Sequence, residues 1–178
     1  MSSLGILSLI ISNFFSVVGV LFFGWNASSL IFLYWFENIV IGIYNVLKML
    51  VVKGKFINAN DGKEYNINKA KIIFIPFFCV HYGIFTLGHG TFLFSIFIKD
   101  LSFNRFLFIS ILTLFISHGV SFLTNYIKNK EFERANLGIL MFAPYGRVFI
   151  MQIVIIFTSA IVVTTGVTLP SLLLLILL

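Results

Sequence analysis

Long uninterrupted apolar runs constrain this chain more than any other feature of its sequence. The run from Phe77 to Ile98 reads FFCVHYGIFTLGHGTFLFSIFI, and it holds about the 20 residues that a helix needs to cross a bilayer. Only 10% of the 178 residues are charged and the mean hydropathy is +1.07, whereas a water-soluble domain needs a more highly charged surface. The runs are continuous rather than alternating, which distinguishes them from membrane β-strands. The sequence therefore predicts an all-α, polytopic transmembrane helical bundle.

The apolar runs divide a single transmembrane domain (1–178) into five full spans and a short or truncated sixth. We expect the full spans at about 4–23, 28–51, 72–98, 106–127 and 145–166, and a partial one at 167–178. As a helix the last run reaches only about 18 Å, less than a hydrocarbon core of about 30 Å, so we expect a truncated helix or a half-span. The run before the fifth span, LGILMFAP, is too short to cross and is expected at the membrane interface.

Lysine and arginine are concentrated on one side of this topology. They gather in two polar loops, at about 53–71 and 128–144, and in the flanks of these loops. Because short loops rich in these residues stay on the cytoplasmic side, we expect both loops and the N-terminus to be cytoplasmic, in the plasma membrane. The residues on that side are Lys48, Lys53, Lys55, Lys63, Lys69, Lys71, Lys128, Lys130, Arg134 and Arg147, against Lys99 and Arg105 on the other.

The formal net charge of +6 does not indicate a nucleic-acid partner, because the basic residues lie in loops where they report orientation. The lipid bilayer is the partner that the sequence predicts, and it names no protein partner. Asp61-Gly62 in the first polar loop predicts a small β-hairpin outside the membrane.

A few strongly polar side chains interrupt the predicted spans. Glu37 is the one acidic residue within them, and an ionised carboxylate in lipid usually faces a bundle interior and finds a partner. At about 1.5 Å per residue, Glu37 and His89 each lie roughly 14 Å from the outer end of their span, His118 roughly 18 Å and Gln152 roughly 21 Å. These four groups form one layer near the midplane, contributed by four helices. His81 lies deeper, roughly 26 Å from the outer face.

Small residues accompany the histidines. Gly83, Gly88, Gly90 and Gly119 flank them, and small residues let membrane helices approach closely. Arg147 is expected to be a membrane anchor whose charge reaches the cytoplasmic headgroups, too far in depth from Glu37 to hold it.

The leading hypothesis for the polar layer is a transition-metal site for Zn, Fe or Cu. Glu37, His89 and His118 would be ligands, with His81 as an alternative ligand, because imidazole and carboxylate suit these metals. Any catalysis is open; a metal-activated water with Glu37 as base or ligand would be the simplest chemistry. No two of these residues lie on adjacent turns of one helix, so the ligands would have to converge from separate helices. Groups that would orient the ligands or bind water are Asn38, Asn125, Gln152 and Ser121.

Three other hypotheses remain open. A chain of Glu and His at mid-membrane is common in proton or ion transporters. Two histidines on facing helices could be axial ligands of a haem. Finally, the polar groups could only hold the helices together, in an assembly or helix-packing module without metal.

Four stretches together resemble a known family. They read YWFENIVIGIYNVLKM, FFCVHYGIFTLGHGTFL, SHGVSFLTNY and PYGRVFIMQIVII, and they resemble DUF6498, prokaryotic multi-pass membrane proteins of unknown function, from about Phe14 to Thr164. The resemblance implies no activity, and its motif positions here are Glu37, Asn38, His81, His89, His118 and Arg147. Two features depart from the family pattern. Gln152 stands where a histidine commonly follows the methionine of the last motif, and the chain ends at Leu178 where members continue through a final helix.

Overall fold

The structure is a computed structural model, and it describes residues 27–53, 56–57, 64–97, 101 and 105–165. The spans expected at 4–23 and 167–178 lie outside these residues. The described part is all-α except for one two-stranded hairpin. Its elements are α2 (Ala27–Val51), β1 (Phe56–Ile57), β2 (Glu64–Tyr65), α3 (Ile67–Phe97), α4 (Arg105–Ser121), the π-helical segment η2 (Phe122–Lys128), the short 3-10 helix η3 (Glu131–Glu133), α5 (Leu137–Phe142) and α6 (Tyr145–Thr165).

Four helical segments among the described residues are long and apolar enough to cross a membrane. They are Ser28–Val51, Ile67–Ile96, Arg105–Lys128 and Leu137–Phe157. Large apolar side chains on the outer faces of α3, α4 and α6 are exposed, which is the surface that a lipid-embedded bundle presents. The described residues are therefore consistent with a membrane protein. They contain four candidate spans and do not support the count of five and a sixth.

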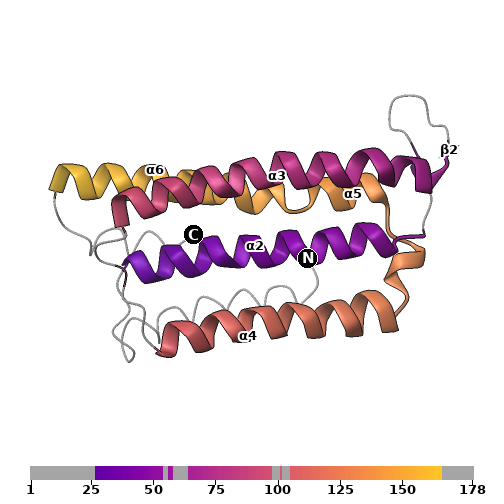
Figure 1. Cartoon of the computed structure of the whole chain (residues 1–178), viewed down its shortest axis with the longest axis horizontal. Coiled ribbons are helices and arrows are strands. Elements are labelled where there is room, and N and C mark those ends of the chain that lie inside the picture. Colours follow the sequence, from indigo (N-terminus) through magenta and orange to yellow (C-terminus); the bar gives the residue numbers. More distant parts are fainter. Residues whose placement is uncertain (1–26, 54–55, 58–63, 98–100, 102–104, 166–178) are drawn as a thin grey trace.

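The polar loop between α2 and α3 contains the predicted hairpin. β1 and β2 pair in antiparallel register, with Phe56 opposite Tyr65 and Ile57 opposite Glu64. The hairpin lies at the end of the bundle where α2 ends and α3 begins (Figure 1).

The helix α2 is the central element of the bundle. It lies between α3 and α4, while α5 and α6 run alongside α3 (Figure 1). The glycines predicted to allow close approach do so at two places. A Cβ on Gly90 of α3 would come within 2.6 Å of the Trp35 ring of α2, and one on Gly119 of α4 within 2.6 Å of the Tyr44 hydroxyl. Two buried apolar clusters, around Ile31 and around Met49, fill the bundle on either side of its midpoint.

The segment expected to lie at the membrane interface begins the last candidate span among the described residues. Asn136 caps α5, its side chain accepting from the backbone N–H groups of Gly138 and Ile139. Pro144 has no N–H, so the carbonyl of Leu140 receives no bond from the residue four positions on. Asn45 of α2 donates to that carbonyl at 2.8 Å. This bond compensates the break, and α5 and α6 together form one apolar segment from Leu137 to Phe157.

The two basic loops meet at one end of the bundle. The backbone N–H of Lys53, after α2, donates to the carbonyl of Phe132 in η3 at 2.8 Å. Nearby, the Tyr126 hydroxyl donates to the carbonyl of Lys48 at 3.0 Å. The described lysines of both loops therefore lie on the same side of the four helices.

Candidate functional site

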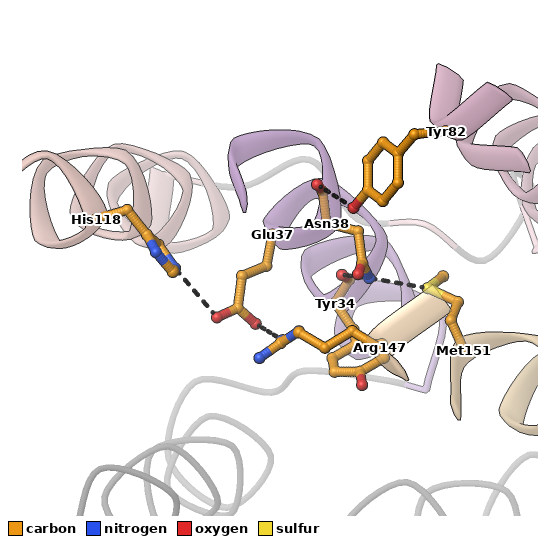
Figure 2. A network of polar contacts seen from close by, with 7 residues as sticks. All are labelled: Tyr34, Glu37, Asn38, Tyr82, His118, Arg147 and Met151. Carbon is orange, nitrogen blue, oxygen red and sulfur yellow. Dashed lines mark hydrogen bonds and ion pairs between the residues drawn. The ribbon is translucent and has the colours of Figure 1, made fainter. Parts of the chain in front are cut away.

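A cluster around Glu37 joins three helices near the middle of the bundle (Figure 2). Its carboxylate extends from α2, and its two oxygens contact different neighbours. His118 of α4 lies with Nε2 at 3.3 Å from Oε1, while Arg147 of α6 forms an ion pair with Oε2. The Glu37 side chain is only 15% exposed, and those of His118 and Arg147 are 30% and 34% exposed. The guanidinium is permanently charged, so it neutralises the buried carboxylate.

This geometry corrects the expectation for Arg147. The expectation that Arg147 lies too far in depth to hold Glu37 is wrong, because the two side chains form an ion pair. A role for Arg147 as a membrane anchor stays a prediction. The error in depth comes from the extra length at the start of the last described candidate span. Arg147 lies ten residues after Leu137, about 15 Å along a helix, rather than in its first turn. The guanidinium also lies 5.0 Å from the centre of the Tyr34 ring, a cation–π contact that further favours its charge there.

Asn38 serves the packing of α2 against α3 and α6. Its amide nitrogen donates to the carbonyl of Tyr34 at 2.8 Å and lies 3.4 Å from the sulfur of Met151 on α6. The hydroxyl of Tyr82 on α3 donates to the Asn38 carbonyl at 2.8 Å (Figure 2). The expected role of Asn38, orienting groups around Glu37, is not what these contacts do.

The other two histidines bond elsewhere. His89 of α3 is buried, and its Nε2 lies 2.6 Å from Oε1 of Gln152 on α6, a bond in which the ring N–H donates. His81 is exposed, and its Nδ1 lies 2.8 Å from the hydroxyl of Tyr145. The structure thus pairs His89 with Gln152, as their similar depth allows, but brings neither histidine to Glu37.

The four expected metal ligands therefore do not form one cluster. Among the described residues, no group of three or more His, Cys, Asp or Glu side chains could hold a metal ion. The physical reason is the central place of α2, which separates the histidines of α3 from His118 of α4 (Figure 1). Whether the protein binds a transition metal stays a prediction. Ser121 and Asn125 bond each other at 3.2 Å on an exposed surface, and no described contact joins them to Glu37.

Several partners of α2 were not found by reasoning from the sequence. The Trp35 indole donates to the carbonyl of Thr86 on α3 at 2.8 Å, and the Tyr44 hydroxyl to the carbonyl of Phe115 on α4 at 3.1 Å. Tyrosine and tryptophan carry one polar group on an apolar ring, and the sequence analysis assigned no partner to Trp35 or Tyr44. The sequence signal that could have found Trp35 and Tyr44 is their position within a span rather than at its ends.

The whole chain matches one family model, described as a family of unknown function (DUF6498), over residues 1–178. The chain belongs to the DUF6498 family. The resemblance predicted from the four motifs is confirmed, and its extent is the full chain rather than Phe14 to Thr164. No curated protein and no solved structure matches the chain. Membership of DUF6498 assigns no activity, so the function has to be inferred from the site itself.

Proposed function

We propose that this DUF6498 protein is a multi-pass membrane protein in which the Glu37 centre has a structural task. The carboxylate holds α4 and α6 against α2, which makes the chain a helix-packing module without a metal at this site. The observation that carries the proposal is the use of both Glu37 oxygens by side chains from two other helices. Each oxygen therefore ties α2 to a different helix.

The energetics of membrane helices support this task. Lipid tails are as apolar as leucine, so no hydrophobic force drives one helix onto another, and specific polar contacts gain weight. Polar side chains of α2 together contact α3, α4, α5 and α6. Trp35 bonds α3, Glu37 contacts α4 and α6, and Asn45 bonds the end of α5.

The test is a double-mutant cycle on the ion pair. Arg147→Gln leaves the Glu37 carboxylate, which is only 15% exposed, without its cation, so it should lower the unfolding free energy by about 3 kcal/mol. Glu37→Gln leaves a guanidinium that is 34% exposed and partly screened by solvent, so its loss should be smaller. The double variant Glu37→Gln/Arg147→Gln should lose less than the sum, with a coupling of at least about 1 kcal/mol. Unfolding in mixed detergent micelles measures these values.

Arg105→Gln is the matched control, because Arg105 is exposed at the start of α4 and its guanidinium contacts only the adjacent Phe106 ring among the described residues. It should change stability little. Single variants as stable as the parent protein, or a double variant whose loss is the plain sum, would refute the structural role.

We further propose the plasma membrane as the location, with the basic loops and the N-terminus in the cytoplasm. Residues 4–23 and 167–178 would add a fifth span and a partial sixth. The meeting of both basic loops at one end of the bundle supports a common side for them. In a Cys79→Ser background, Asn129→Cys should react with an impermeant maleimide only after cells are permeabilised, whereas Lys99→Cys should react in intact cells. The reverse pattern would invert the topology.

A further inference from the structure

A groove on the outer side of the bundle lies between α3 and α6, separate from the Glu37 centre. Its volume is about 260 Å³. Its walls are apolar, with Phe85 and Phe92 on α3 and Ile156 on α6. Gly88, which has no side chain, also lines the α3 wall. The His89–Gln152 pair is the polar part of its lining. Phe85 and Phe92 are seven residues apart, so they lie on the same face of α3.

The polar pair retains hydrogen-bonding capacity that the described residues do not use. His89 is buried and donates to the carbonyl oxygen of Gln152. Gln152 itself is exposed, and its amide nitrogen carries two further N–H donors that find no acceptor among the described residues. An unused donor at this depth favours a ligand with an acceptor oxygen, because lipid tails offer none.

The depth of the pair restricts what that ligand can be. His89 lies eight residues from the end of α3 at Phe97, about 12 Å into the helix, so phospholipid headgroups stay out of reach. A ligand there must be apolar overall and must still present an acceptor oxygen. A flat ring with carbonyl groups and a hydrocarbon tail meets both conditions, and it also fits between aromatic walls.

We propose that this groove binds the head group of an isoprenoid quinone. One quinone carbonyl accepts from the Gln152 amide, the ring lies against Phe85 and Phe92, and the tail leaves along the apolar outer face of the bundle. Binding alone is proposed, with no electron or proton transfer.

The experiment uses the full chain in lipid nanodiscs and a short-chain ubiquinone as the probe. In a Trp25→Phe background, Trp35 is the one remaining tryptophan and reports binding, because its ring lies against Gly90, next to His89, and quinones quench indole fluorescence. The parent protein should show a saturable quenching step above the linear quenching due to partition into lipid. An alkylbenzene with a tail of matched length but no carbonyl should not compete.

Two glycine variants provide a matched pair on the same helix. A Cβ meets nothing within 4 Å at either Gly88 or Gly83, so a side chain begins in open space at both, but only Gly88 lines the groove. Gly88→Leu should weaken ubiquinone binding at least tenfold, and Gly83→Leu should leave it within twofold. Gln152→Leu should weaken it as well.

Equal binding in all variants would overturn the proposal. So would full competition by the alkylbenzene, which would indicate a site for acyl chains, or the absence of any saturable step. The stability cycle on Glu37 and Arg147 is independent of these outcomes, since neither residue lines the groove.

Discussion

The Glu37 centre and the His89–Gln152 pair lie on different sides of α2 and differ in what they leave free. At the Glu37 centre a charged carboxylate is enclosed, and its two oxygens are used by α4 and α6. At the His89–Gln152 pair an imidazole and a neutral amide join α3 to α6 beside a groove. A charge in lipid needs a partner within the bundle. A neutral amide can leave hydrogen-bonding groups free for a ligand at a lower energetic cost. The first region is therefore suited to holding helices, and the second to binding.

The largest expected difference between the two regions concerns the loss of one partner. Arg147→Leu leaves the Glu37 carboxylate buried and without its cation, so the unfolding free energy should fall by about 3 to 5 kcal/mol. Gln152→Leu removes only a neutral hydrogen bond and should cost about 1 kcal/mol. Unfolding in mixed micelles compares the two variants directly. Equal losses would mean that the Glu37–Arg147 ion pair and the His89–Gln152 hydrogen bond contribute equally to stability, which would contradict the comparison.

A second test concerns the close contact between α2 and α3, which lies on the His89 side. In Gly90→Ala the new methyl group overlaps the Trp35 ring, so the indole must move and stability should fall by about 1 to 3 kcal/mol. Gly83→Ala is the control on the same helix, because its methyl group meets no atom within 4 Å. The thermal midpoint of the two variants in one detergent decides the matter, and a Gly90→Ala protein as stable as the control would contradict the packing described.

The smallest expected effect separates a buried hydroxyl from a more accessible one. Tyr82→Phe removes the bond to the Asn38 carbonyl, inside the α2–α3 contact, and should cost about 0.6 to 1.7 kcal/mol. Tyr145→Phe removes the bond to the exposed His81 and should cost less. The thermal midpoints of the two variants measure both losses. A larger loss for Tyr145→Phe would mean that the contact with His81 contributes more to stability than the bond to Asn38.

The sequence predicted the helical class, the hairpin and the axial position of the polar groups. Helix rise alone placed Glu37, His89, His118 and Gln152 in one layer, because depth follows from counting residues. It could not predict which neighbours each helix of the bundle would have. With α2 between α3 and α4, groups of equal depth were divided into two sites, and no property of a single helix reports that arrangement.

Arg147 was missed for a different reason. The break at Ala143-Pro144 was interpreted as the boundary between an interfacial piece and a span. Proline does remove the hydrogen bond to Leu140, but Asn45 from another helix supplies a replacement. A tertiary contact of this kind keeps a broken helix in the membrane and moves every later residue deeper, which brings Arg147 to Glu37.

The most direct test of two separate sites is the thermodynamic coupling between Glu37 and His89. Unfolding free energies of Glu37→Gln, His89→Leu and the double variant in one detergent measure it. Since the two residues share no partner among the described contacts, the two losses should add to within about 0.5 kcal/mol. A coupling well above 1 kcal/mol would mean that Glu37 and His89 act as one unit, as shared ligands of a metal would, and would contradict the division of the polar layer by α2.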